Sequence, residues 1–209
     1  MESGQGGKSG LNGPNGLNGK ATPILLSSGW RARAIASLEW LLLKVLSQSQ
    51  FETLLLWAFG VRIPMLLFAT PTVVELNEQR CEIRIPLNWR TRNHLGSMYF
   101  GTLAVGADCA GGLMAMRLIQ KHRVPVSLIF KDFQADFIKR AEGDVHFSLE
   151  AQHSGSSIPA LVQRAIDTGE RQNLKVEVVA TVPKKTGSQP VARFQLTLSL
   201  KRRSGELSS

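Results

Sequence analysis

NHLGSMYFGTLAVGADCAGGLMAMRLIQK, residues Asn93 to Lys121, is the stretch that decides the fold. A turn containing Asn and Gly leads into a long apolar segment whose spacing predicts a helix. At about 100° per residue, one narrow stripe of this helix carries Gly101, Ala104, Asp108, Gly111 and Ala115. The other faces are apolar as well, which is typical of a helix buried on nearly all sides.

The same helix carries glycines and one carboxylate, and both are unusual in a buried helix. Each glycine costs about 1 kcal/mol relative to alanine, so we expect another backbone to approach it closely. Asp108 lies too far into the helix to be an N-cap. Burial predicts a raised pKa for its carboxyl unless a partner or water reaches it, and this makes Asp108 the leading functional candidate.

The composition favours anionic partners. The 209 residues are 43% hydrophobic, enough for a core, and the formal net charge is +9. This balance suits nucleic acid, acidic lipid or a small molecule that carries phosphate. The two cysteines, Cys81 and Cys109, lie on unrelated segments. We therefore expect neither a disulfide scaffold nor a cysteine metal site, and we expect the protein to reside in a reducing compartment.

The first third of the chain predicts a tail and a helical arm. Residues 1–29 are rich in Gly and Asn and predict a disordered tail. Residues 30–69 show apolar residues at helical spacing, and Gly60 and Pro64 end the pattern. The segment from Trp30 to Phe59 fits a membrane-surface helix or a lid on the following domain, and we favour the lid. With no apolar run of about 18 residues and no signal-peptide pattern, a cytoplasmic location is expected.

From Pro71 the hydrophobic period changes to two, which predicts strands. We expect an α+β domain over 70–203, a mostly antiparallel curved sheet wrapped around the long helix, followed by a polar tail at 204–209. The expected strands 126–139 and 144–152 form a hairpin at Ala-Glu-Gly, and a short helix covers 158–170. The other expected strands are 73–76, 81–87, 174–182 and 191–201.

At this point the sequence resembles the hotdog-fold thioesterases, over roughly residues 60–202 in element order. The motif is similar to that of the PaaI-type acyl-CoA thioesterases, but with its helical arm and the insert at 158–170 the chain looks closer to a poorly characterised branch of hotdog proteins than to PaaI itself. The resemblance rests on five residues at the family's spacings: Asn93, Gly96, Gly101, Asp108 and Ala110. The chain differs from the family in its His-Gly-Gly motif: Tyr99 stands where the family has His, and Phe100 stands where it has the first Gly.

The resemblance implies a homodimer, which could pair into tetramers, with active sites at the subunit interface. Backbone N–H groups near Gly101 and Phe100 would hold the charge that develops on a thioester carbonyl. Asp108 lies about 10 Å further along the helix, so it would come from the other subunit. It would act as general base on water or as nucleophile, and both remain open. Asn93 would position the water or the substrate carbonyl.

The predicted activity is hydrolysis of an acyl-CoA or another acyl thioester. Coenzyme A would be part of the substrate, so we expect no retained cofactor and no metal. A non-catalytic hotdog module that binds acyl chains or acyl-CoA is the alternative, and it is favoured by the departure at Tyr99 and Phe100. Nucleic-acid binding has only the charge in its favour, because the aromatic residues form no stacking platform. The substrate-binding candidates are Gly96, Tyr99, Phe100, Lys131, Lys139 and Arg140, with Lys184 and Lys185 as further phosphate contacts.

Overall fold

The computed structural model describes residues 47–153 and 156–203. The tail at 1–29, the first part of the arm and the polar tail at 204–209 therefore lie outside the described residues, and those predictions stay predictions.

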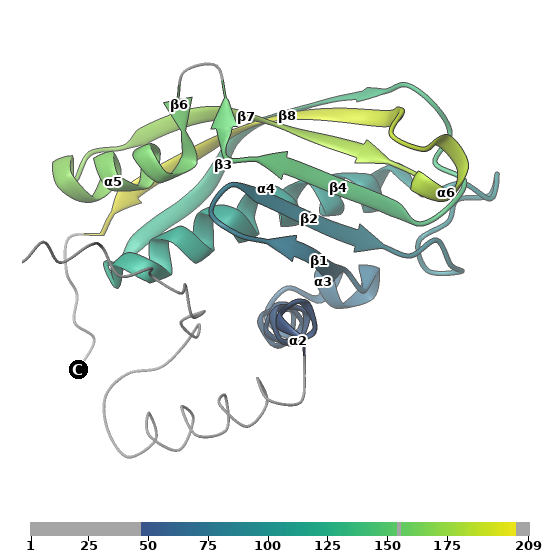
Figure 1. Cartoon of the computed structure of the whole chain (residues 1–209), viewed down its shortest axis with the longest axis horizontal. Helices are drawn as coiled ribbons and strands as arrows, with labels where there is room; N and C mark the ends of the chain where they lie inside the picture. The colour runs from purple at the N-terminus through teal and green to yellow at the C-terminus, as the bar shows by residue number, and fades with distance from the viewer. Residues whose placement is uncertain (1–46, 154–155, 204–209) are drawn as a thin grey trace, which may run out of the picture.

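A six-stranded antiparallel sheet, in the order β1-β2-β4-β7-β8-β3, forms the main layer (Figure 1). Its exposed and buried positions alternate, so one face packs inward and the other faces solvent. The strands are β1 (Thr72–Leu76), β2 (Arg80–Ile85), β3 (Val126–Phe137), β4 (Val145–Glu150), β7 (Gln172–Thr181) and β8 (Pro190–Arg202). A separate pair, β5 (Gln152–His153) and β6 (Ser156–Ser157), precedes the second core helix.

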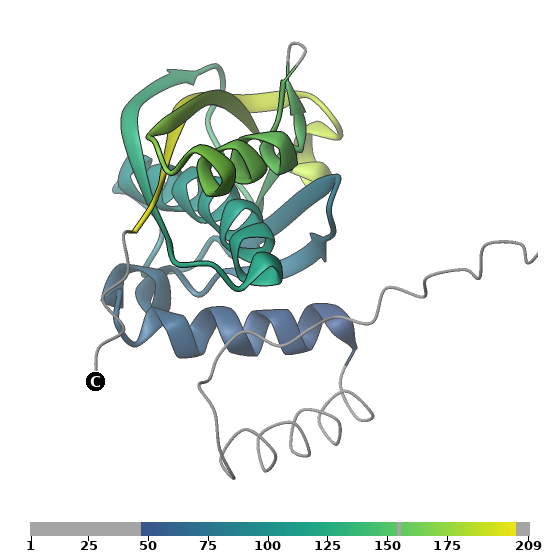
Figure 2. The same cartoon turned by 90° about the vertical axis from the view of Figure 1, so that its left-hand side faces the viewer.

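The long helix α4 (Phe100–His122) packs on the inner face of this sheet and contacts strands from both of its halves (Figures 1 and 2). Helix α5 (Ile158–Thr168) covers β7, β8 and part of α4. In the part of the chain that the structure describes, α4 is the one helix long and apolar enough to cross a membrane by length and composition, but most of that stretch is buried inside the molecule. The predicted architecture, an antiparallel sheet around one long helix, is confirmed.

The glycines of α4 make room for aromatic rings, not for a second backbone as expected. A Cβ on Gly106 would come within 2.3 Å of the Phe147 ring, which is fully buried on β4. At Gly111 the nearest atoms belong to the Phe130 ring of β3, at 3.4 Å from such a Cβ. The helix therefore sits close to its sheet because ring faces fill the space that side chains on α4 would otherwise take.

The predicted hairpin between the third and fourth strands is wrong. β3 pairs with β8 at one edge of the sheet, whereas β4 pairs with β2 and β7 in its middle. The chain from Ile138 to Asp144 therefore crosses the end of the sheet, and the N–H groups of Ile138 and Lys139 donate to the carbonyl of Val191. A short Gly-containing connection indicates a turn, but strand pairing is decided by contacts distant in sequence. The other expected strands are present, and they pair as two hairpins, β1 with β2 and β7 with β8; the short helix α6 (Pro183–Thr186) lies in the second connection.

The described part of the arm, residues 47–69, forms two helices, and the first of them packs beside β1. Helix α2 (Gln48–Gly60) begins at a capping box in which Ser47 and Gln50 satisfy each other's backbone N–H groups. Thr53 accepts a hydrogen bond from the Val73 N–H, and the Trp57 indole donates to the Pro71 carbonyl, each joining α2 to the entry of β1. This part of the arm therefore packs on the domain that follows it, and its role as a lid stays a prediction. Helix α3 (Pro64–Ala69), which the sequence did not predict, follows at once.

The inward face of α2 differs from the predicted apolar stripe. Leu54 and Ala58 are exposed, and the buried positions include Glu52. The Glu52 carboxylate makes an ion pair with Arg117 of α4, and burial raises its pKa while Arg117 opposes that rise. A buried charge is tolerated in an apolar interface when such a partner is present.

Candidate active site

The N-terminus of α4 is open. Tyr99 is the N-cap, and its side chain makes no capping hydrogen bond. The first N–H to bond backward is that of Leu103, which donates to the Tyr99 carbonyl at 3.1 Å. The N–H groups of Phe100, Gly101 and Thr102 donate to no described residue. They leave a cluster of donors with the positive end of the helix dipole behind it.

A turn closed by Asn93 leads into this helix terminus. The Asn93 Oδ1 accepts hydrogen bonds from the N–H groups of Leu95 at 2.9 Å and Ser97 at 3.2 Å. Gly96 has φ of 79°, a left-handed conformation that side chains disfavour. In this structure Asn93 and Gly96 shape the turn. The predicted contact of Asn93 with water or a carbonyl stays a prediction.

Three hydrogen bonds, two of them between residues distant in sequence, fix this turn against the rest of the domain. The Tyr99 N–H donates to the carbonyl of Thr91, and the Met98 N–H donates to that of Ala141, both at 2.8 Å. The Arg140 guanidinium donates to the Leu95 carbonyl at 2.5 Å. These supports were missed in the sequence because no local pattern marks them. Arg140 itself was predicted, but as a substrate contact.

Tyr99 is the N-cap of α4 and Phe100 is its first residue, and both side chains are exposed. Their ring centroids are 4.8 Å apart. A Cβ on Gly101 would come within 2.5 Å of the Tyr99 ring, so this ring lies directly against the Gly101 backbone. The residues that replace the family's His and Gly therefore place aromatic surface beside the predicted oxyanion donors.

Asp108 lies on the same side of α4 as Gly101, because seven residues are close to two helical turns. Its side chain reaches the surface and makes no hydrogen bond or ion pair with any described residue. Partial burial among apolar neighbours nevertheless raises the pKa of this carboxyl, in the predicted direction. The two observations agree, since an accessible carboxylate with apolar neighbours has lost part of its hydration shell.

The face of α4 around Asp108 is not buried within one chain, contrary to the prediction of a helix covered on nearly all sides. Gly101, Ala104 and Val105 are half-buried, whereas Leu103, Ala107 and Cys109 on the opposite side are buried. Beside this open face runs β3, an edge strand with exposed Ile129, Phe133 and Phe137. Helix α4 and β3 also contact each other, at Gly111 and the Phe130 ring.

Several predicted basic contacts gather at the end of the molecule where α4 begins. Lys139 and Arg140 follow β3, and Arg140 holds the Asn93 turn as described above. Lys185 of α6 packs its stem close to Gly143 in the same connection. Lys184 precedes it on α6, and all four side chains are exposed. Lys131 lies apart from them, halfway along β3 at the irregularity between Phe130 and Phe133.

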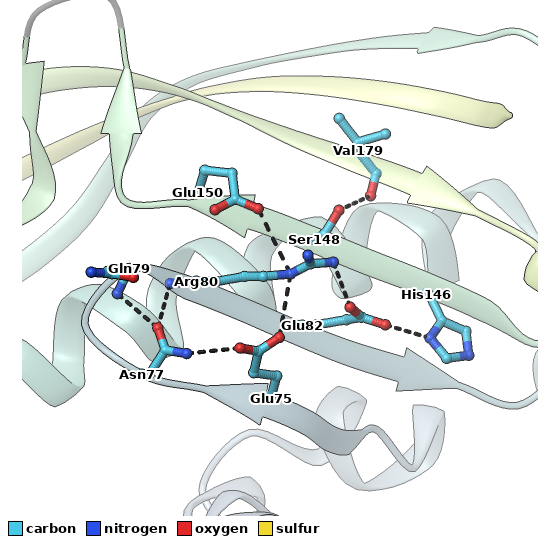
Figure 3. A network of polar contacts seen from close by, with 9 residues as sticks. All are labelled: Glu75, Asn77, Gln79, Arg80, Glu82, His146, Ser148, Glu150 and Val179. Atoms are coloured by element: carbon cyan, nitrogen blue, oxygen red, sulfur yellow. Dashed lines mark hydrogen bonds and ion pairs between the residues drawn. The ribbon is translucent and has the colours of Figure 1, made fainter. Parts of the chain in front are cut away.

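Other titratable groups do not join this site. Cys109 is buried, and burial raises the pKa of its thiol well above the usual range, so it belongs to the core as expected. A polar network on the outer face of β1, β2 and β4 centres on Arg80, which contacts Glu75, Glu82 and Glu150 (Figure 3). His146 completes it through Glu82, at 2.7 Å. The network lies on the solvent face of the sheet and ties three strands together. Within the described residues, no three His, Cys, Asp or Glu side chains are grouped so as to hold a metal ion.

Comparison with known proteins places the chain. The model of a family described as a domain of unknown function (DUF4442) matches residues 52–200, most of the chain. The chain belongs to the DUF4442 family. The matched residues run from the buried Glu52 of α2 to Leu200, near the end of β8. The family model therefore includes most of α2 together with the sheet and the long helix. A search of curated proteins gives no match.

Solved structures share the fold of this DUF4442 protein at low identity. A Pseudomonas aeruginosa protein, PA5026, described as a probable thioesterase, is 21% identical with a TM-score of 0.57, covering 69% of this chain and 91% of its own. A Chlorobaculum tepidum protein of unknown function is 13% identical with a TM-score of 0.63, over 73% and 95%. Thioesterase HI1161 from Haemophilus influenzae is 14% identical with a TM-score of 0.51, over 68% and 85%. The predicted hotdog fold is confirmed by these neighbours.

Proposed function

We propose that this protein hydrolyses an acyl thioester, with an acyl-CoA as the substrate. The observation that carries the proposal is the joint placement of two features on the open side of α4: uncapped N–H donors at its start and an unpaired Asp108 two turns later. Similarity of fold to proteins described as thioesterases supports the same reaction class.

The reaction follows from these groups. The Asp108 carboxylate accepts a proton from water while the water oxygen attacks the thioester carbonyl. The charge on the carbonyl oxygen is stabilised by the N–H groups of Phe100 and Gly101. When the tetrahedral intermediate collapses, the C–S bond breaks and the leaving thiolate takes up the proton. In the second route Asp108 attacks the carbonyl directly, the C–S bond breaks to expel the thiolate, and water then hydrolyses the resulting anhydride to the free acid and the Asp108 carboxylate.

The site requires a homodimer. Asp108 and the donors at Gly101 are about 10 Å apart along one helix, too far to act on the same carbonyl. Antiparallel pairing of two α4 helices through their open faces would bring the acid of one subunit to the donors of the other. A long edge strand with exposed apolar side chains supports such pairing, because these strands are ordinarily covered. Dimers that pair further into tetramers are compatible with this arrangement.

Coenzyme A fits the basic end of the molecule. Its diphosphate and ribose phosphate carry negative charge, and Lys139, Arg140, Lys184 and Lys185 are exposed near the start of α4. Tyr99 and Phe100 would contact the acyl group or the pantetheine arm beside the donors. Lys131 is a weaker candidate, because its position halfway along β3 is remote from this cluster.

A thiol-release assay across short, long and aromatic acyl-CoAs tests the proposal. Wild type should hydrolyse at least one class, and Asp108→Asn should lose about three orders of magnitude in kcat with an unchanged circular dichroism spectrum. If neither protein releases thiol from any substrate while acyl-CoA still binds, the non-catalytic acyl-binding module is the correct function. Equal, measurable hydrolysis by both proteins would remove Asp108 from the mechanism.

A further inference from the structure

An apolar patch lies on the α2–α3 side of the molecule (Figures 1 and 2). It is formed by large side chains that protrude from the turn after α2, from α3 and from the loop after β2. Val61 is 71% exposed, Met65 57% and Trp89 75%, values more typical of charged residues. The patch consists of Val61, Ile63, Met65, Leu67, Phe68 and Trp89. Figures 1 and 2 show α2 and α3 together along this side of the domain.

Two parts of the patch, α3 and the loop after β2, are joined by a ring contact. Phe68 of α3 and Trp89 of the loop meet edge to face, with centroids 6.5 Å apart. The Arg90 guanidinium lies 6.0 Å from the Phe68 ring centroid and 5.8 Å from that of Trp89. Segments more than twenty residues apart in sequence therefore form one surface whose rim carries a cation.

The two chain segments that form the patch are basic and contain no carboxylate. Residues 53–74 and 83–107, which supply the patch and its neighbours, contain no Asp or Glu. Arg62, Arg90 and Arg92 make no ion pair with any described residue. By contrast, the outer face of β1, β2 and β4 carries the carboxylates that surround Arg80 (Figure 3). The charge on this protein is thus segregated, with unpaired arginines beside the exposed apolar residues.

A lipid bilayer with anionic headgroups matches this surface. Apolar side chains on a protruding turn can enter the headgroup boundary, Trp prefers that depth, and arginines reach lipid phosphates. A second copy of this chain fits less well. Symmetric pairing would bring the unpaired arginines of both copies together without an acid between them.

We propose that the patch from Val61 to Phe68, with Trp89 and its arginine rim, docks the protein on the surface of anionic membranes. The α2–α3 turn inserts its aliphatic side chains, and Arg62, Arg90 and Arg92 contact headgroup phosphates. The predicted lid role of α2 is unaffected, because the patch uses the outward residues of the arm. Since Arg92 precedes Asn93 directly, docking brings the start of α4 close to the bilayer. The inference stands apart from the thioesterase proposal.

Cosedimentation of the full chain with vesicles tests the proposal. Wild type should bind vesicles of phosphatidylcholine with phosphatidylserine, bind pure phosphatidylcholine far less, and dissociate as salt is raised. Met65→Glu should weaken binding about tenfold or more, because an inserted apolar side chain becomes charged. Arg62→Glu should weaken it at least about fivefold.

Two control variants introduce the same kinds of charge change at positions outside the patch. Val74→Glu places the same charge at an exposed apolar position on β1, and Lys175→Glu reverses an exposed charge on β7; both should bind as wild type does. Failure of wild type to bind anionic vesicles would overturn the proposal. So would undiminished binding by Met65→Glu and Arg62→Glu, which would assign the contact to another segment such as residues 1–46. A lipid-free change of association state in these variants, seen by light scattering, would show that a second copy occupies the patch.

Discussion

One side of α4 is packed against the sheet at ring-contact distance, and the opposite side is left open with an acid on it. On the packed side, Gly106 faces the Phe147 ring so closely that no side chain fits. On the open side, Gly101, Ala104 and Asp108 are only partly covered. Small residues thus serve different purposes on the two sides of the helix: on the packed side they allow close packing within the chain, and on the open side they leave room for a partner or substrate.

This difference corrects a simple interpretation of glycine-rich helices. Apolar residues all round a helix indicate that every face is covered, but they do not say by which molecule. In α4 the sheet covers one side, and the open side is complete only if a second subunit or a ligand covers it. Substitutions on the two sides should therefore have different consequences.

The largest effect is expected on the packed side. Gly106→Val should reduce the free energy of unfolding by on the order of 3 kcal/mol, because its side chain overlaps the Phe147 ring. Gly112→Ala is the matched control, since its Cβ would be 3.8 Å from Phe130, an ordinary contact. It should stabilise by about 0.5–1 kcal/mol through its helix propensity. Urea denaturation measures both, and equal losses would show that the two glycines are packed alike.

The next effect concerns catalysis at the open N-terminus. Phe100→Pro removes one proposed oxyanion donor, the Phe100 N–H, which bonds to no described residue. The fold should tolerate the proline, because Tyr99 already has the extended conformation that a residue before proline adopts. We expect kcat for the best acyl-CoA to fall about 100-fold. Phe100→Ala removes the same ring but keeps the N–H, so it should lose much less. If both variants lose activity equally, the ring matters and the N–H does not.

The smallest effect is a pH-dependent change in stability at Asp108. Its folded pKa is raised, so between the ordinary carboxyl pKa and the raised value the folded state holds more protons than the unfolded state. Stability therefore falls as pH rises through that window. Asp108→Asn should melt at a slightly higher temperature than wild type at neutral pH, and the difference should vanish in acid below the ordinary carboxyl pKa. A lower melting temperature for the variant at neutral pH would contradict this.

Sequence patterns predicted the long helix, the antiparallel strands and the raised pKa of Asp108, because helical and strand periodicities are local and strong. They failed where partners are distant in sequence. No local pattern near Ala141 shows that the chain crosses there to another part of the sheet. No local pattern near Glu52 shows that it pairs with Arg117, 65 residues further along the chain. Likewise, the exposure of Asp108 could not be predicted, because an open helix face and a buried one have the same apolar composition.

The central claim is that donors and acid of one site come from different subunits, and co-expression of two inactive variants tests it most directly. Phe100→Pro and Asp108→Asn each disable both sites of their own dimers. In a mixed dimer one site carries both substitutions and the other carries neither. Random pairing should therefore restore about a quarter of wild-type thiol release. If the purified mixture contains mixed dimers but hydrolyses no faster than either variant alone, donors and acid act within one chain and the paired site is wrong.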